Sequence, residues 1–183
     1  MFDSKPLAQQ LSRLDSDGVV LVEVGTEDAT EAALASAKCL VEKGAFGIIL
    51  SADRPYSKLV QLYKGAGVDS ARLFFIDCVS KAAMANPPKA DNVAYVDGAG
   101  DLTRIAITIT AALDAAKGRR FLLVDSVSTF LVYEKPGVFF GFIHAILTRL
   151  RISDANGVLF LEPGTDRLLR AEIVQLCDKV IKA

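Results

Sequence analysis

Short runs of apolar residues alternate with amphipathic segments along most of the chain, and this alternation constrains the fold more than any other feature. The runs are rich in Val, Ile, Leu and Phe, as strands are when helices cover both faces of a parallel sheet. The segments predicted as strands are Gly18–Val24, Gly47–Ser51, Arg72–Asp77, Asn92–Val96, Phe121–Asp125 and Gly157–Leu161, with Lys179–Ile181 as a candidate last strand. Repeated strand–helix units with right-handed crossovers predict a three-layer α/β/α sandwich with a mainly parallel central sheet.

Two segments between the predicted strands carry helical stripes. Apolar residues recur every three or four positions from Leu102 to Ala116, and Gly118 follows as a C-cap residue. A second apolar stripe runs between Gly137 and Asn156. Both segments are therefore predicted as helices that pack one face on the sheet.

The length of 183 residues suits one domain with a single core, which we place at residues 1–183. Residues 1–17 are expected to form an N-terminal helix or extension. Residues 80–91 contain a proline pair and are expected to form a surface loop. The sequence shows no repeat or linker that would divide the chain.

Charge and hydropathy exclude several classes of protein. Lysine plus arginine number 21 and aspartate plus glutamate 22, with no basic run, so neither a nucleic acid nor a membrane is an expected partner. The first residues resemble no signal or transit peptide, and no apolar run reaches the ~20 residues of a membrane helix. We therefore expect a cytoplasmic protein. Cys39, Cys78 and Cys177 lie far apart among apolar neighbours and are expected to be reduced, buried thiols.

The turns after the predicted strands carry many carboxylates. In a doubly wound sheet, ligands bind beyond the carboxyl ends of the strands. The residues expected there are Gly25, Ala52, Asp53, Asp77, Asp97, Asp125, Ser126 and Glu162. Because buried carboxylates must be solvated, paired or bound to a cation, this acidic crevice is a candidate site for a cation or a cationic small ligand.

Four segments form an ordered series along the chain. They are VVLVEVG at 19–25, EKGAFGIILSADRPYSKLVQLYKGAGVD at 42–69, RLFFIDC at 72–78 and RRFLLVDSVSTFL at 119–131. In order and spacing they resemble the RecA-like ATPases, most of all the KaiC-like branch, from the P-loop strand to the Walker B strand. The resemblance implies a RecA-like, P-loop NTPase-like topology with a nucleotide site after the first strand.

The P-loop positions of this resemblance depart from the pattern G-x-x-x-x-G-K-[ST]. Aligned from the first glycine, the pattern falls on Gly25, Thr26, Glu27, Asp28, Ala29, Thr30, Glu31 and Ala32. Thr30 replaces the second glycine, Glu31 replaces the phosphate-binding lysine, and Ala32 replaces the magnesium-binding hydroxyl. A carboxylate ~4 Å from a phosphate oxygen repels it by roughly 4 kcal/mol at an effective dielectric of 20. This degenerate Walker A motif predicts poor binding of a nucleoside triphosphate.

The acidic residues of this stretch have two structural interpretations. Asp28 and Glu31 fit a capping box, with Asp28 as the N-cap and Glu31 at N3, so that side chains satisfy the helix N–H groups that a phosphate would otherwise accept. Alternatively, they are solvated acids at a helix start, where the helix dipole favours them. Both interpretations predict poor triphosphate binding.

Two aspartates keep positions that the resemblance associates with hydrolysis. The KaiC-like branch carries two glutamates after its second strand, whereas the stretch SADRP at 51–55 keeps only Asp53, beside Arg54, whose charge lowers the basicity of a carboxylate. Asp125 keeps the Walker B position, which holds magnesium when nucleotide is bound. Asp53 and Asp125 are therefore the candidate catalytic residues and Asp125 the candidate metal ligand, with structural roles as the alternative.

The sequence lacks the residues that other kinds of catalytic site require. His144 is the only histidine, and it lies off the apolar stripe of its predicted helix, so we expect it at the surface or at an interface. Ser126 and Ser128 follow Asp125 without a G-x-S-x-G pattern. A hydrolase triad is therefore not expected.

The start of the helix predicted between Gly137 and Asn156 favours association with another chain. Residues 137–142 are apolar on all sides, which is more than contact with one sheet face requires. Val138, Phe139, Phe140 and His144 are therefore the interface candidates, with a deeply buried helix as the alternative. The resemblance also implies association, because RecA-like proteins commonly assemble into rings, filaments or dimers.

Three functions remain open from the sequence. We expect a non-catalytic pseudo-ATPase that acts as a protein-binding, assembly or regulatory module, with no cofactor and with either another copy or another protein as partner. The second is an ATP-binding or ATP-hydrolysing enzyme with a non-standard loop, which would use ATP and magnesium. The third is binding of a cation or a small ligand in the acidic crevice.

Overall fold

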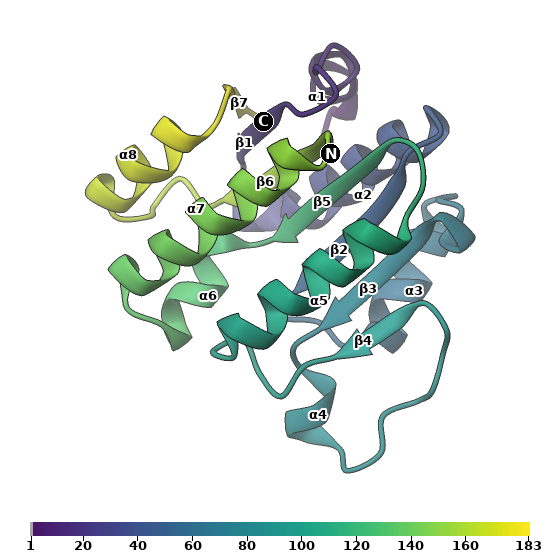
Figure 1. Cartoon of the computed structure of the whole chain (residues 1–183). Helices are drawn as coiled ribbons and strands as arrows, with labels where there is room; N and C mark the ends of the chain where they lie inside the picture. Colours follow the sequence, from purple (N-terminus) through teal and green to yellow (C-terminus); the bar gives the residue numbers. More distant parts are fainter. Residues whose placement is uncertain (1) are drawn as a thin grey trace.

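The computed structural model describes residues 2–183, and all of its strands lie in one parallel sheet covered by helices on both faces (Figure 1). The strands are β1 (Val19–Glu23), β2 (Phe46–Ser51), β3 (Leu73–Asp77), β4 (Val93–Tyr95), β5 (Arg120–Asp125), β6 (Ala155–Leu161) and β7 (Lys179–Lys182). The helices are α1 (Ser4–Leu11), α2 (Thr26–Glu42), α3 (Tyr56–Gly65), α4 (Ser80–Ala83), α5 (Leu102–Ala115), α6 (Val127–Tyr133), α7 (Pro136–Ile152) and α8 (Arg167–Leu176), with a 3₁₀ turn at Ser70–Arg72. Every predicted strand is confirmed, with its ends within two residues of the prediction.

The strand order is β4-β3-β2-β5-β6-β1-β7, and every pair is parallel. The register aligns the carboxyl ends of the central strands, because Ser51 of β2 lies beside both Asp77 of β3 and Asp125 of β5. Glu23 of β1 lies beside Leu161 of β6 at the same edge. The turns after these strands therefore meet at one end of the sheet.

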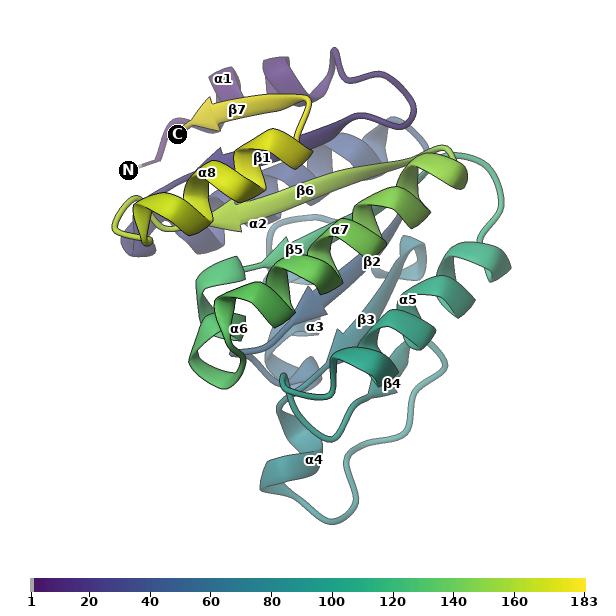
Figure 2. The ribbon, with the colours of Figure 1, turned by 60° about the vertical axis from the view of Figure 1, so that its left-hand side comes forward.

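The helices and the sheet form the three predicted layers (Figure 2). An apolar core lies between the sheet and each helix layer. On one face, residues of α5, α6, α7 and α8 pack on the sheet, and on the other face residues of α1, α2 and α3 do so. Strands β1 and β6 are neighbours, yet the helices that follow them, α2 and α8, lie on opposite faces. Such a change of face opens a crevice beyond the carboxyl ends of the strands.

The second core requires a glycine in β2. A Cβ atom at Gly47 would lie 2.4 Å from the Phe121 ring and 2.7 Å from the Leu73 side chain, both of which are fully buried. A hydrogen in place of the methyl group lets both large side chains pack on this strand. Gly47 therefore leaves the space in which the side chains of the neighbouring strands β3 and β5 pack.

Several segments differ in detail from the sequence predictions. Helix α5 ends at Ala115 with Ala116 as its C-cap, so Gly118 is not the cap but takes a positive φ of 75° in the turn before β5. Residues 80–91 begin with the short helix α4 and then form a mostly exposed loop. Helix α1 lies within the 1–17 segment and packs on α2. Among residues 2–183, no helix is long and apolar enough to cross a membrane.

The three cysteines are free thiols. Cys78 is buried, whereas Cys39 and Cys177 are only half-buried, so the expectation of buried thiols holds fully for Cys78 alone. Burial, with a smaller effect of neighbouring aspartates, raises the pKa of Cys78 and of Cys177 to about 12. These thiols therefore remain protonated and weakly nucleophilic at neutral pH.

Candidate functional site

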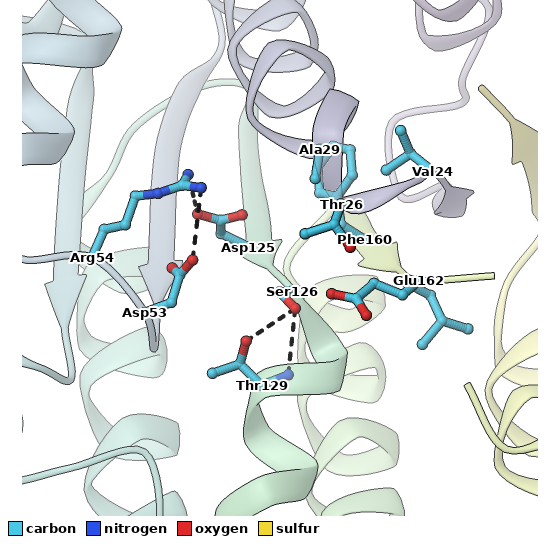
Figure 3. Close-up of a pocket in the computed structure, with 11 residues that line it drawn as sticks. Val24, Thr26, Ala29, Asp53, Arg54, Asp125, Ser126, Thr129, Phe160 and Glu162 are labelled. Atoms are coloured by element: carbon cyan, nitrogen blue, oxygen red, sulfur yellow. Dashed lines mark hydrogen bonds and ion pairs between the residues drawn. The ribbon is translucent and has the colours of Figure 1, made fainter. Parts of the chain in front are cut away.

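A small cavity lies at the carboxyl ends of β1, β6, β5 and β2, where the sequence predicts a crevice (Figure 3). Its lining residues are Val24, Thr26, Ala29, Asp53, Arg54, Asp125, Ser126, Thr129, Phe160, Leu161 and Glu162. The cavity volume is about 80 Å³. That volume holds a few water molecules, whereas pockets for drug-sized ligands and cofactors measure about 300–1,000 Å³.

Arg54 places a cation between the two candidate catalytic aspartates (Figure 3). Its Nη1 atom lies 3.5 Å from Oδ2 of Asp125, and its Nη2 atom lies 3.8 Å from Oδ2 of Asp53. The three side chains come from the turn after β2 and from the end of β5, which the sheet register brings together. An internal guanidinium therefore occupies the place beside Asp125 where a bound cation would otherwise balance its charge.

The buried position of Asp125 changes its acidity. Burial and, to a smaller extent, the negative charge of Asp53 raise the pKa of this carboxyl to about 6, against the opposite effect of Arg54. A carboxyl with this pKa is partly protonated just below neutral pH, which makes it a weak ligand for magnesium there. Asp53 is partly exposed and also accepts a hydrogen bond of 3.1 Å from the Ser51 hydroxyl.

The turn from β5 to α6 is strained at Ser126. This residue has φ of 63° and ψ of 91°, which is uncommon for a residue with a side chain. The Ser126 hydroxyl accepts hydrogen bonds from the backbone N–H of Thr129 at 3.3 Å and from its hydroxyl at 3.0 Å. The hydroxyl thus caps α6, and no histidine lines the cavity to activate it.

Only Val24 and Gly25 separate β1 from helix α2, so no phosphate loop lies between them. The N-cap of α2 is Gly25, its first helical residue is Thr26, and the N–H of Asp28 already donates to the Gly25 carbonyl at 3.1 Å. The predicted capping box is therefore wrong, because Asp28 lies in the first turn and Glu31 in the second. The alternative interpretation holds for Glu27 and Asp28, which lie where the helix dipole favours acids.

The Glu27 carboxylate lies against Gly25. A Cβ atom at Gly25 would be 2.8–2.9 Å from the carboxylate atoms of Glu27, so this side chain fills the space beside the only glycine that the P-loop pattern retains. An anion at this place would meet the negative charge of Glu27.

The other P-loop positions point in different directions. Thr26 and Ala29 line the cavity, and Thr30 faces a narrow gap beside Arg54. Glu31, at the lysine position, is exposed, whereas Ala32, at the hydroxyl position, is fully buried in the core under α2. The structure therefore does not bring these positions together around one ligand.

Two of the predicted crevice acids lie outside the cavity. Asp77 is completely buried and accepts hydrogen bonds from the N–H groups of Tyr56 and Ser80 at 2.7 and 2.8 Å and from the Ser80 hydroxyl at 2.6 Å. Asp97 is exposed and pairs with Lys81 at 3.0 Å. Asp77 thus fixes the turns after β2 and β3, and only Asp53, Asp125 and Glu162 face the cavity. Among residues 2–183, no three His, Cys, Asp or Glu side chains are placed to hold a metal ion.

The interface candidates on α7 divide between core and surface. Phe139 is fully buried and stacks on Phe130 with ring centroids 5.6 Å apart, so it is wrong as an interface residue. Phe140 is half-buried, whereas Val138 and His144 are exposed. The apolar start of α7 therefore reflects burial on one side and exposure of Val138 on the other.

Sequence reasoning missed the part played by Arg54. The sequence shows it beside Asp53, where its charge is expected to weaken a base, but its contact with Asp125 spans 71 residues and depends on the strand order. The strain at Ser126 also has no signal in the sequence, because serine is an ordinary N-cap residue.

Comparison with known proteins bears on the fold. The model of a family described as "Family of unknown function (DUF7504)" matches residues 18–183. The chain belongs to this family. No curated protein matches the DUF7504 chain.

The architecture of the DUF7504 chain also occurs in solved structures. One of them is an uncharacterized protein, PH0321, from Pyrococcus horikoshii, crystallised in complex with an unknown peptide. The sequences are 14% identical, the TM-score is 0.70, and the match covers 97% of this chain and 82% of the other. The likeness shows a shared parallel-sheet α/β fold, which is compatible with a RecA-like domain.

Proposed function

We propose that this DUF7504 chain is a RecA-like pseudo-ATPase of the KaiC-like type that binds a protein partner instead of a nucleotide. The start of α2 at Thr26 is the observation that carries the proposal. A P-loop wraps phosphates with the N–H groups of an irregular segment between strand and helix. Here residues 26–32 are helical, so most of those N–H groups are hydrogen-bonded within α2.

The contacts of Asp125 and Glu27 support the same proposal. Arg54 supplies a positive charge to Asp125 from within the chain, and Glu27 places a negative charge beside Gly25. A triphosphate with magnesium would have to displace the first contact and approach the second. Both steps cost free energy that an intact P-loop site does not require.

An exposed apolar surface at the end of α6 and the start of α7 supports a protein partner. Val132, Tyr133 and Val138, which we name the α6–α7 corner, are large apolar residues exposed within a stretch of seven. Val132 and Tyr133 lie at the end of α6, whose N-cap Ser126 and residue Thr129 line the cavity, and Val138 lies in the first turn of α7. Neighbouring exposed aromatic and aliphatic side chains are typical of protein interfaces. The peptide bound to PH0321 is consistent with a peptide ligand for this fold.

Calorimetric titration with ATP and ADP in the presence of magnesium tests the loss of nucleotide binding. We expect no saturable heat at nucleotide concentrations of about 1 mM, which corresponds to a binding free energy weaker than about −4 kcal/mol. Magnesium-dependent binding at micromolar concentration that disappears in Asp125→Asn would overturn the proposal and favour the ATP-using enzyme instead.

The same titration of the variant Thr30→Gly, Glu31→Lys, Ala32→Thr tests whether the P-loop side chains alone would restore ATP binding. We expect that it also fails to bind ATP, because these positions lie within the helix and residue 32 faces the core. If the variant bound ATP, the replaced side chains alone would explain why the natural chain does not bind ATP, and the early start of α2 would not be the cause.

Selection from a displayed random-peptide library tests the partner surface. We expect enriched peptides whose affinity falls at least about tenfold with Val132→Glu, because a charge then opposes an apolar contact. Ile152→Glu is the matched control, since Ile152 is similarly exposed at the other end of α7. Equal losses in both variants, or no enrichment at all, would count against the α6–α7 corner as a binding surface.

A further inference from the structure

Helix α5 presents an exposed face that no part of residues 2–183 covers. Ile107 is 64% exposed at its centre, and Ala111 and Ala115 follow on the same side at intervals of one turn. Beside them, a groove of about 660 Å³ opens between α5 and the starts of β2 and β3, with Phe46 and Phe74 in its wall. Figure 2 shows α5 on the outer surface of its layer, beside the β4 edge of the sheet.

The apolar face of α5 lies between charges of opposite sign. Arg104 lies toward the amino end of the helix and Asp114 toward the carboxyl end, and their side chains are 62% and 59% exposed. Each lies five residues from Ile109, which corresponds to about 7.5 Å along the axis. Their partners within the chain are Asp101, 3.7 Å from Arg104, and Arg149. Both pairs reach solvent and leave the charges available to a second partner.

We propose that the protein forms a homodimer in which α5 of one copy packs antiparallel on α5 of another, about a two-fold axis at the level of Ile109. In this arrangement Ile107 of each copy meets the small side chain of Ala111 on the other. Arg104 of each copy comes next to Asp114 of the other. A two-fold contact is self-complementary by symmetry, so one matched pair of charges produces two.

The same face fits a second copy better than an unrelated helix. Ile107 protrudes from α5, whereas the surface at Ala111 is shallow, and the two-fold axis places Ile107 of one copy on Ala111 of the other. The axis pairs Arg104 with Asp114 in the same way. Alanines also allow helix axes to approach within about 8–10 Å. This inference is independent of the proposed function, because the dimer forms whether or not the cavity binds a nucleotide.

The contact is small, and we expect a weak dimer. Helix α5 has 14 residues and is therefore about 21 Å long, so one helix pair with its flanking groove buries less surface than a standard interface. A dissociation constant of roughly 10–100 µM corresponds to such a contact. In sedimentation velocity, the mass should rise from 19.6 kDa toward twice that value as the concentration of the chain increases through this range.

Charge reversal on α5 tests the orientation of the two copies. Arg104→Glu places two carboxylates together at each contact, and Asp114→Arg places two cations together. Each variant alone should therefore have a dissociation constant at least about tenfold higher than the natural chain. An equimolar mixture of the two should regain the dimer, because each contact in the mixed pair then joins a cation to a carboxylate.

Mixing the two variants separates a loss of the α5 contact from a loss of the fold. A misfolded variant would not regain the dimer when mixed, and thermal unfolding of each variant checks its fold directly. Ile107→Glu should also remove the dimer, whereas Ile152→Glu, a change of a similarly exposed residue on α7, should leave it intact. A monomer at about 300 µM natural chain, a dimer that persists in Ile107→Glu, or a mixture that stays monomeric would each overturn the proposal.

Discussion

At the scale of single residues, Asp125 links the candidate site to stability. Its carboxyl is buried at the end of β5, and burial raises its pKa to about 6, whereas the ordinary value is 3.8. At a pH between these two pKa values, Asp125 has released its proton in the unfolded chain and still holds it in the folded chain. The contribution of Asp125 to stability is therefore complete below about pH 4 and is lost as the pH rises through about 6.

Asp125→Asn should remove this pH dependence. The natural chain should lose about 2–3 kcal/mol of unfolding free energy between about pH 4 and about pH 7 through this group, whereas the neutral amide has no proton to release. Urea unfolding at a series of pH values measures the difference. Asp53→Asn is the matched control, because removal of its negative charge lowers the pKa of Asp125 and should shift the midpoint of the loss to lower pH. Parallel pH profiles for the natural chain and Asp125→Asn would contradict the assignment.

The position of Asp125 was predictable from the sequence, but its environment was not. An apolar run that ends in aspartate and serine predicts a buried strand followed by a turn, and the structure confirms both. The contact with Arg54 depends on β2 and β5 being neighbours, although 71 residues separate the two side chains. No local pattern in the sequence determines that pairing.

At the scale of elements, hydrophobic periodicity predicts the strands better than capping rules predict helix starts. The five inner strands are short apolar runs that the helix layers bury on both faces, so composition alone marks them. For the start of α2, Gly25 and Asp28 are both acceptable caps. A start at Thr26 adds helical hydrogen bonds and still leaves Glu27 and Asp28 in the first turn, where the dipole favours them.

Helix α7 shows that the sequence also does not decide which residues of an apolar segment are exposed. Its first residues are apolar on all sides, which is consistent with either an interface or deep burial. The structure buries Phe139 against Phe130 and exposes Val138, one position before it in the sequence. The deciding contact comes from α6, because Phe130 of that helix stacks on Phe139.

At the scale of the whole molecule, Asp178 joins three parts of the fold that are distant in sequence. Its Oδ2 atom accepts a hydrogen bond of 2.7 Å from the N–H of Val19 at the start of β1. Its carboxylate also pairs with Arg151 near the end of α7 at 3.1 Å. It precedes β7, which covers the outer edge of β1. The side chain of this residue, which directly precedes the last strand, thus connects the first strand to the helix layer.

Asp178→Ala should lower the free energy of unfolding by about 1–3 kcal/mol, because the N–H of the fully buried Val19 then loses a hydrogen-bond acceptor. Asp178→Asn should retain most of the stability, since an amide oxygen still accepts that bond and only the exposed ion pair with Arg151 is lost. Urea unfolding compares the two variants, with the exposed Asp91→Ala as a control for loss of a surface charge. Equal losses for the alanine and asparagine variants would show that the charge of Asp178, and not its hydrogen bond to β1, holds this end of the sheet together.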